Sequence, residues 1–459
     1  MPALLGLLLA ASIDGTAALR DASALAALGP HPWGSTRNEA AAQYVAAQMR
    51  AVGLPQVELQ RFERHGIQGT NVVGSLSAPG DEIVVLGAHH DSVAGSPGAY
   101  DDAGGVGVLL EVAHALAQEG ARARTFVFVS FDGEEAWTTG KGQTAGSRAY
   151  LERLGPRARR VVAMLAIEMS GWPGGTPAAH PIAYADPRVP GAAVISPGWL
   201  VQAALDGSRS TGEPLRVGDP RLSWLYQPAV RAFRVRLHGD DLSFAQAGLP
   251  ALMLSDSSFS AFYPEYHQPG DVAERLDAVA LARMGRAALG VARALDRAGG
   301  RVAEPAWFAA FGHVVSGSWL LGLGALSLLP GLRAGFVAGT GPVLLRLVQA
   351  AAFAALLWSE PVVALWVFLV PHLLLPLTRR WWAVLLALAP LVALVAIGVA
   401  AWWREAVSGV WLAPWQLAVA GLAFALAFVG LAAGAPGRAR SSAAPGKRRK
   451  APGLPKRGR

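Results

Sequence analysis

The sequence predicts an α/β domain followed by an all-helical membrane region. Apolar runs of strand length alternate with helical patterns up to about residue 300, and between residues 306 and 434 charged residues almost vanish. Alternating strands and helices are typical of a sheet covered by helices, and this length is enough for one large α/β domain. The composition agrees, because only 16% of the residues are charged, against about a quarter in soluble proteins.

The α/β domain is expected at residues 20–297. Apolar runs predict strands, and helical periodicity predicts helices. The expected strands are residues 81–88, 125–131, 160–167, 230–237 and 249–256, and the expected helices are residues 104–118 and 276–297. Residues 1–19 are apolar for about ten residues before Asp14, too few for a spanning helix of about 20. We interpret them as a signal or anchor-like segment, with a buried helix start as the alternative.

The membrane region follows a linker at residues 298–305. Its five apolar segments are each near the length that spans a bilayer: residues 306–330, 335–358, 361–377, 381–403 and 410–434. Ten of the fifteen Trp fall between Trp307 and Trp415, as an aromatic belt would place them. Arg333, Arg379 and Arg380 put the first and third loops in the cytoplasm by the positive-inside rule. The sequence therefore predicts a multi-pass membrane protein whose α/β domain is extracytoplasmic.

The net charge of +8 does not indicate nucleic-acid binding. Residues 438–459 carry nine Lys or Arg and no acid, so the rest of the chain sums to 8 − 9 = −1. A basic tail at residues 435–459, next to an apolar segment, is typical of a disordered cytoplasmic end that meets anionic lipid. The chain has no Cys, which excludes disulfides and thiolate ligands. A metal ion would have to be held by His, Asp and Glu.

Three predicted strands end in such residues: "VVLGAHHDS", "VFVSFDGEEA" and "VAMLAIEMSG". Ligands of open α/β sheets bind beyond the carboxyl ends of the strands, so this recurrence predicts a site. If the first strand continues, His89 and His90 point to opposite sides, whereas His89 and Asp91 share one. A metal-bound His is often supported by a carboxylate. We therefore expect His89 to be a ligand supported by Asp91, and His90 to be an ordinary surface or packing residue.

The other acidic residues complete a hydrolytic pattern. Asp101 or Asp102 meets the start of a helix, and a carboxylate there could bridge two cations. Glu134 and Glu135 diverge as neighbours, which suits one for metal binding and one as a general base. Glu168 follows an apolar strand and needs a metal ion or another buried partner. His267, after Tyr266, is a further candidate in a Pro/Gly loop.

Together these motifs resemble the di-zinc aminopeptidase and glutamate-carboxypeptidase family. The ordered set is "GAHHDS…PGAYDDAGG…FDGEEA…AIEMSG…EYHQPGD", and residues 30–54 are similar to the family's lead helix. The resemblance implies a three-layer α/β/α sandwich with a mixed, mostly parallel sheet and two Zn²⁺. It assigns one ion to His89, Asp101 and Glu168, and the other to Asp101, Glu135 and His267. It makes Glu134 the general base, Tyr266 the donor to the oxyanion, and Asp91 the residue that orients His89.

One departure refines the resemblance: many members have Asp where this chain has Glu168. Glu stands there in the multi-spanning endoplasmic-reticulum metallopeptidase and vacuolar membrane protease type, which also has membrane helices after the peptidase domain. The leading hypothesis is thus a membrane-anchored di-zinc exopeptidase, preferably an aminopeptidase, whose partners are a peptide substrate and the lipid bilayer. The acid that would hold the amine of the substrate is sought among Asp240, Asp241, Asp256 and Glu265, with the first two preferred.

Three alternatives remain at this point. An inactive receptor or scaffold on the same fold would usually have lost ligands, and this chain has kept them all. A single-zinc cyclase or amidohydrolase is disfavoured by the retention of Asp101 and of the Glu134–Glu135 pair. A transporter is suggested only by Arg346 and His372 within the apolar segments. The sequence does not predict the substrate, the oligomeric state or a role of the membrane helices beyond anchoring.

Overall fold

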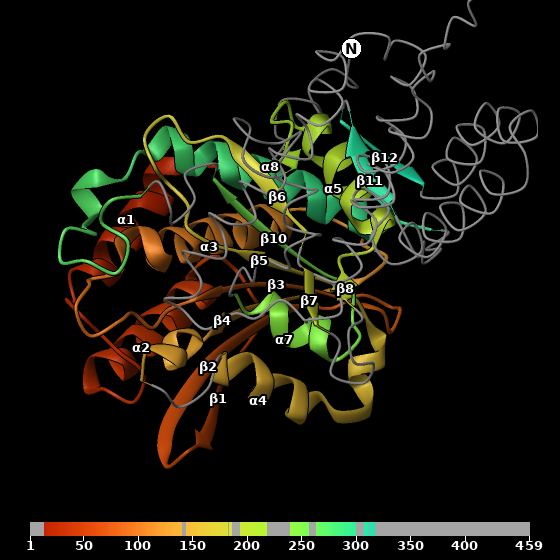
Figure 1. Ribbon diagram of the computed structural model, residues 1–459. Coiled ribbons are helices and arrows are strands. Elements are labelled where there is room, and N and C mark those ends of the chain that lie inside the picture. The colour runs from red at the N-terminus through yellow and green to blue at the C-terminus, as the bar shows by residue number, and fades with distance from the viewer. Residues whose placement is uncertain are drawn as a thin grey trace, which may run out of the picture.

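The computed structural model describes residues 13–139, 144–181, 183–185, 193–217, 239–256, 263–299, 307–310 and 312–316. The predicted strand at 230–237, nearly all of the predicted membrane region and the basic tail lie outside these ranges. Among the helices in the described ranges, none is long and apolar enough to cross a membrane. The account that follows therefore concerns the α/β domain (Figure 1).

Eight of the described strands form one mixed sheet in the order β1-β2-β4-β3-β5-β10-β6-β9. The four central strands, β4, β3, β5 and β10, run parallel, whereas β1, β2 and β6 pair with neighbours in antiparallel fashion. The strands are β1 (Gln56–Arg64), β2 (Ile67–Leu76), β3 (Ile83–His89), β4 (Thr125–Phe131), β5 (Val161–Ile167), β6 (Pro177–His180), β9 (Arg216–Val217) and β10 (Ala251–Asp256). The parallel centre brings the carboxyl ends of four strands to one edge.

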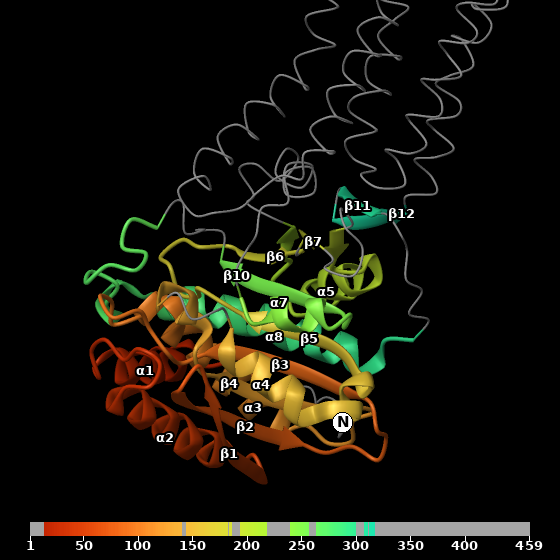
Figure 2. The same cartoon turned by 60° about the horizontal axis from the view of Figure 1, so that its bottom comes forward.

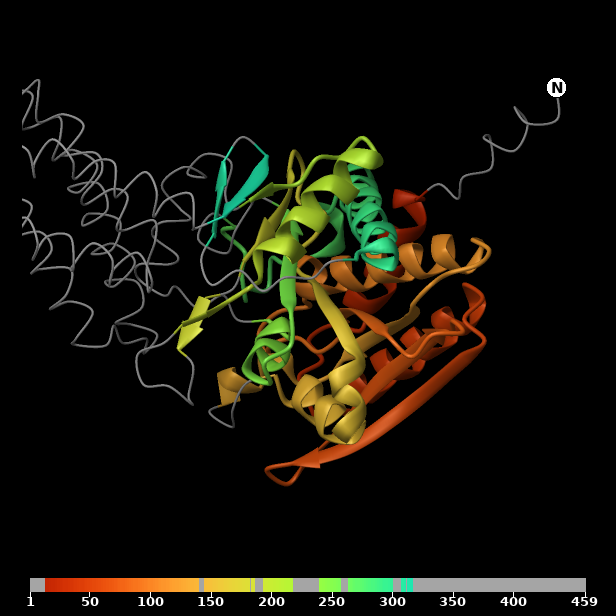
Figure 3. The same cartoon turned by 90° about the vertical axis from the view of Figure 1, so that its right-hand side faces the viewer.

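Helices cover both faces of this sheet. The α-helices are α1 (Gly15–Ala26), α2 (Thr36–Ala51), α3 (Gly104–Ala117), α4 (Ala145–Leu154), α5 (Gly198–Ser210), α7 (Asp241–Gln246) and α8 (Ala278–Arg297). Contacts with the strands place α2, α3, α5 and α8 on one face, with α1 packed outside α3 and α8. The helices α4 and α7 cover the other face, as Figures 2 and 3 show.

The strands supply both cores because their side chains alternate between the faces. Leu86 of β3 joins the larger core, while its neighbour Val85 joins the smaller one. Phe128 and Phe131 of β4 divide in the same way. A strand that is buried on both faces reads as a continuous apolar run, and this is why the central strands could be predicted from sequence. The predictions of β3, β4, β5, β10, α3 and α8 are confirmed to within a few residues.

The start of the domain differs from the prediction of residue 20. Helix α1 begins at Gly15, and the Asp14 carboxylate caps it by accepting from the Thr16 and Ala17 amides. Its residues Ala18, Ala22 and Leu25 are fully buried in the larger core. The predicted boundary was wrong, because the first residues of an amphipathic helix rich in Ala and Leu were assigned to the signal or anchor-like segment.

The start of the predicted membrane region also differs. The sequence predicts a helix from residue 306, but the structure has two antiparallel strands, β11 (Trp307–Ala310) and β12 (His313–Ser316). The Val314 amide donates to Gln202 of α5 at 2.7 Å. The remaining strands, β7 (Ala183–Ala185) and β8 (Ala193–Ile195), form another antiparallel pair. The other predicted segments lie beyond the described ranges and stay predictions.

The close contact of α1 with α3 depends on Gly107. A Cβ added there would stand 2.3 Å from the carbonyl oxygen of Ala18, a backbone atom that cannot move aside cheaply. Gly107→Ala is expected to lower the free energy of unfolding by about 1–3 kcal/mol, as overpacked cores do, despite the better helix propensity of Ala. Urea denaturation measures it. Gly120→Ala is the control, because a Cβ there meets nothing within 4 Å. Equal stability of the two variants would contradict this packing.

Candidate metal centre

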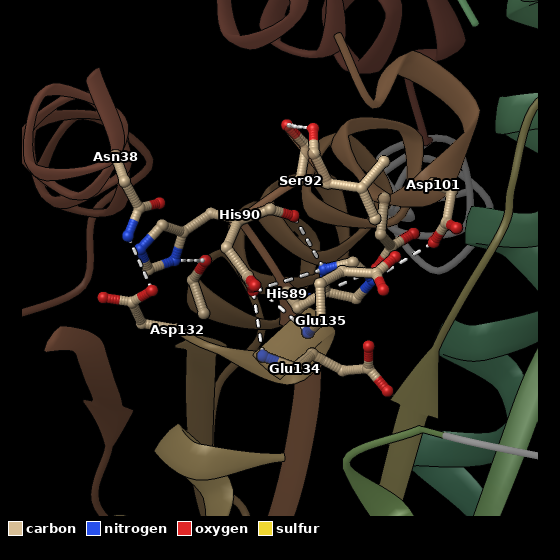
Figure 4. Close-up of polar contacts among 12 residues, drawn as sticks. Asn38, His89, His90, Ser92, Asp101, Asp132, Glu134 and Glu135 are labelled. Atoms are coloured by element: carbon tan, nitrogen blue, oxygen red, sulfur yellow. Dashed lines mark hydrogen bonds and ion pairs between the residues drawn. The ribbon is translucent and has the colours of Figure 1, made fainter. Parts of the chain in front are cut away.

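Five potential metal ligands meet beyond the carboxyl ends of the central strands. His89 is the last residue of β3, and Glu168 directly follows β5. Glu135 lies in the short 3₁₀ helix η2 (Glu134–Thr139) after β4, and Asp101 lies in the turn η1 (Ala99–Ala103) before α3. His267 comes from the loop between β10 and α8, where it adopts a φ of 59°. Figure 4 shows His89, Asp101 and Glu135 beside one another.

The five residues form two groups that share Asp101, and a further set of His89, Glu134 and Glu135 also has its ligand atoms within 4.8 Å of one another. His89 Nε2 lies 3.2 Å from Asp101 Oδ1 and 3.6 Å from Glu168 Oε2. His267 Nε2 lies 3.2 Å from Asp101 Oδ2 and 2.7 Å from Glu135 Oε1. In each group the three ligand atoms are within 4.8 Å of one another. Asp101 thus presents one oxygen to each histidine, which is the geometry of a bridging ligand.

The donor set fits zinc. Imidazole nitrogens and carboxylate oxygens are ordinary zinc ligands, and three protein ligands leave a coordination position for water. The buried oxygens Glu134 Oε1 and Glu168 Oε1 have no hydrogen-bond partner among the described residues. Within the same ranges, Asp101, Glu134 and Glu168 form no ion pair with Lys or Arg. Buried carboxylates without a counter-charge are costly, and divalent cations would supply that charge.

The pKa shifts of these residues reflect the number of buried carboxylates that lie close together. Burial raises the pKa of Glu134 well above its usual range, and the charge of Glu135 raises it further. Burial also raises the pKa of Glu168, with only partial relief from His89. Burial would lower the pKa of His89, but hydrogen bonds with Asp101 and Asp91 hold it well above the usual value. The two imidazole rings are thus the positive groups that face these carboxylates, because no Lys or Arg lies in the described part of the site.

Comparison with known families identifies this part of the chain. Residues 71–292 match the model of "Peptidase family M28", and this range holds every residue of the two groups. The domain belongs to peptidase family M28. The resemblance found in the motifs of the sequence is therefore confirmed at the level of the family.

Two curated relatives and one solved structure illustrate the similarity. Leucine aminopeptidase 1 of Metarhizium robertsii is 24% identical over 255 residues, which are 53% of this chain and 59% of that protein. The vacuolar membrane protease of Laccaria bicolor is 32% identical over 127 residues, which are 24% of this chain and 12% of that protein. The chain thus spans less than two thirds of either relative. An aminopeptidase from Aneurinibacillus sp. strain AM-1 shares the fold, with a TM-score of 0.50 at 16% identity over 64% of this chain and 97% of that one.

In the M28 domain, Asp91 contacts two of the motifs. Its carboxylate accepts from the amides of Glu134 and Glu135 at 3.0 and 3.1 Å. The carboxylate also lies 3.5 Å from His89 Nδ1, while the Asp91 carbonyl oxygen is closer to that nitrogen, at 3.0 Å. Asp91 therefore joins the first His motif to the Glu pair, a role that spacing along the chain did not reveal.

His90 points away from the metal ligands, toward Asn38 and Asp132 (Figure 4). Its Nδ1 lies 2.9 Å from the Ser130 hydroxyl, and the ring is fully buried. Burial lowers its pKa to about 3, so the ring is neutral. Of the two roles expected for His90, the structure supports packing and not the surface.

Tyr266 lies over His267, with ring centroids 3.8 Å apart and an interplanar angle of 21°. Burial raises the pKa of Tyr266 well above its usual value, and Asp101 and Glu135 raise it further. Its burial and these neighbouring charges therefore favour the protonated hydroxyl. The structure places Tyr266 next to the second group of ligands, as a proton donor there requires.

The four acids considered for the amine of the substrate differ in their surroundings. Asp256 accepts from the Tyr100 hydroxyl and from the Trp172 amide, and Glu265 pairs with Arg275 at 3.2 Å. Asp240 and Asp241 are fully buried, and none of their oxygens has a hydrogen bond of normal geometry within the described ranges. Burial raises the pKa of Asp240 to about 7, although the Ser147 hydroxyl partly offsets it. Of the four acids, Asp240 and Asp241 are therefore the two without an ion pair or a hydrogen bond of normal geometry among the described residues.

Two aspartates that sequence reasoning did not select contact the ligand segments. Asp102 accepts from the amides of His89 and Met169, and Asp271 accepts from those of Tyr100 and Asp101. The sequence feature that could have indicated them is their position: each acid lies in a Gly-containing stretch, within a few residues of a candidate ligand. Sequence alone could not separate such supporting carboxylates from ligands.

Proposed function

We propose that this chain is a membrane-anchored di-zinc exopeptidase that removes residues from the amino terminus of peptides. The observation that carries the proposal is the position of Asp101, whose two oxygens each face one histidine at 3.2 Å. One shared carboxylate between two complete ligand triples is what a pair of zinc ions requires. The first ion would be held by His89, Asp101 and Glu168, and the second by Asp101, Glu135 and His267.

Zinc ions at these positions would polarise the scissile carbonyl and lower the pKa of a water molecule, the two services that metal ions supply in hydrolysis. Glu134 would then take the proton of that water and pass it to the leaving amine. The buried Oε1 of Glu134 has no hydrogen-bond partner among the described residues, so it is available to accept that proton. The contacts of Asp91 with the amides of Glu134 and Glu135 hold the base and the ligand in fixed relative positions.

Tyr266 would donate its hydroxyl proton in a hydrogen bond to the oxygen that becomes negative during attack. A preorganised donor of this kind contributes most when it is aimed at the developing charge. The stacking of Tyr266 on His267 fixes its ring next to the second ligand group. The high pKa of Tyr266 keeps the donor protonated.

The charge of the site favours a substrate with a free amine. The charge of buried Asp240 acts on both Glu134 and Glu168, and its neighbour Asp241 is equally buried, so the site holds more acid than the ligand set itself needs. A peptide that brings a positive amino terminus is attracted to such a site, and one that brings a carboxylate is repelled. An aminopeptidase is therefore favoured over a carboxypeptidase.

Membrane anchoring remains part of the proposal on sequence grounds. The apolar segments after residue 316, the distribution of Trp and the Arg of the short loops support a multi-pass membrane protein. In this arrangement the peptidase domain is extracytoplasmic and the basic tail is cytoplasmic. The bilayer and peptides are then its partners, and nucleic acid is not.

Zinc analysis and a digest of paired peptides test the proposal. The purified full-length chain is expected to hold two zinc ions. It should cleave the first bond of peptides with a free amino terminus and spare the same peptides after acetylation. Peptides amidated at the carboxyl end are the matched control and should be cleaved as before. Fewer than two bound zinc ions per chain, or cleavage that ignores acetylation, would reject the proposed function.

A further inference from the structure

Two buried aspartates next to the ligands, Asp102 and Asp271, belong to neither ligand group. Both are at most 1% exposed. Their carboxylates accept hydrogen bonds mainly from backbone amides of segments that carry ligands. A carboxylate that holds several amides fixes the backbone from which the ligands extend, and supporting residues of this kind tune metal affinity.

Asp102 joins the segments of His89 and Glu168. Its Oδ2 accepts from the His89 amide at 3.2 Å, and its Oδ1 accepts from the Met169 amide at 3.0 Å. Oδ1 also accepts from the Gly105 amide, at 3.1 Å, in the first turn of α3. Any Cβ on Gly105 would stand 2.2 Å from the same oxygen, so only glycine at this position leaves room for the carboxylate. Asp102 thus sets the spacing between the ends of β3 and β5.

Asp271 joins the segments of Asp101 and His267. Its Oδ1 accepts from the Tyr100 amide and from the Tyr263 hydroxyl, each at 2.7 Å, and its Oδ2 accepts from the Asp101 amide at 3.3 Å. The Asp271 amide itself donates to the carbonyl of Gln268, the residue after His267. The loop that carries His267 is therefore fastened to the backbone of the bridging ligand.

The two sets of contacts do not overlap. In the described part of the chain, the hydrogen bonds of the Asp102 carboxylate reach no residue of the His267 loop, and those of Asp271 reach neither β3 nor β5. Asp101 belongs to both groups, and its amide donates to Asp271 while Asp102 follows it in the chain. Apart from this shared ligand, each aspartate contacts the segments of one ligand group.

We propose that Asp102 and Asp271 are positioning residues that hold the two metal sites separately. Asp102 fixes the site of His89, Asp101 and Glu168, and Asp271 fixes the site of Asp101, Glu135 and His267. This inference rests on the proposed di-zinc function. Substitution of either aspartate, neither of which binds an ion itself, should therefore weaken the binding of one zinc ion and not of the other.

The test measures zinc affinity of the metal-free full-length chain by competition with a chelating indicator. Asp102→Asn and Asp271→Asn are each expected to weaken one of the two sites about 10–100-fold and to leave the other unchanged. Asp21→Asn is the matched control, because Asp21 is 2% exposed and accepts from the Tyr44 hydroxyl of α2, outside the ligand segments. The control should lower the unfolding temperature to a similar extent without a change in zinc affinity.

Double substitutions assign each effect to a site. His267→Ala removes the second site, so adding Asp271→Asn should change little further, whereas adding Asp102→Asn should weaken the remaining ion about 10–100-fold. In a His89→Ala background, adding Asp102→Asn should change little further, whereas adding Asp271→Asn should weaken the remaining ion. Should an Asn variant fail to fold, Tyr263→Phe removes one donor from Asp271 and should weaken the second site alone, by about fivefold.

The outcomes separate this inference from the function on which it rests. Two zinc sites in the wild type, with unchanged or equally weakened affinities in both Asn variants, would overturn the division of the sites and leave the proposed function standing. A wild-type chain that binds fewer than two zinc ions would overturn the proposed function and the division with it. Selective loss of one site in each variant supports the division.

Discussion

Glu134→Gln is expected to lower kcat for peptide hydrolysis by about 10²–10⁴-fold, the usual contribution of a general base, while both zinc ions stay bound. Gln has the same shape as Glu but cannot accept the proton of the attacking water. The backbone amide of residue 134 would still donate to Asp91, as it does at 3.0 Å in the wild type. The change therefore removes the base without disturbing the ligands around it.

The measurement pairs kcat with the zinc content and the unfolding temperature of the same preparation. The unfolding temperature should not fall, since the substitution relieves repulsion between Glu134 and Glu135. Glu111→Gln is the control. Glu111 is a largely buried carboxylate that accepts from the Asp14 amide, far from the site, so this variant should keep its activity. Unchanged hydrolysis in Glu134→Gln would show that another group is the base.

Asp101→Ala has the second large expected effect, the weakening of both zinc sites together. The side chain supplies one oxygen to each ligand group. Its removal leaves each ion with one His and one Glu. We expect zinc content below one ion per chain and hydrolysis at the background level. Titration of the metal-free chain with zinc, followed by a peptide assay, measures both quantities.

The control for Asp101→Ala is Asp21→Ala. Asp21 is 2% exposed and accepts from the Tyr44 hydroxyl at 2.8 Å, on α1 and far from the metal ligands. This control should lose stability and keep two ions. His267→Ala offers a further contrast, because it should remove the second ion and leave the first. A chain that still binds two zinc ions after Asp101→Ala would exclude Asp101 as the bridge.

The ends of the central strands show how far sequence reasoning reached. β3, β4 and β5 are buried on both faces, so each reads as an uninterrupted apolar run with polar residues directly after it. The hairpin of β1 and β2 was missed for the opposite reason. It contributes an edge strand whose residues alternate between exposed and half-buried, and such a strand carries no continuous apolar signal.

Asp101 and Asp102 mark the limit of that reasoning at the site. Both follow the same turn, and spacing along the chain left either one as a candidate bridge. In the structure the oxygens of Asp101 face two imidazole rings, whereas those of Asp102 face three backbone amides. The difference arises from β5 and the His267 loop, which approach these residues from distant parts of the chain.

By itself, the sequence determined the strand-forming core, the chemical type of every candidate ligand and the apolar character of the region after the domain. These are local properties, because burial and donor type can be read from a residue and its near neighbours. Only the tertiary structure decided which carboxylates face the histidines and which hold the backbone. That choice depends on Asp101, Glu168 and His267 meeting at one sheet edge, and contacts between such distant segments exist only after the chain has folded.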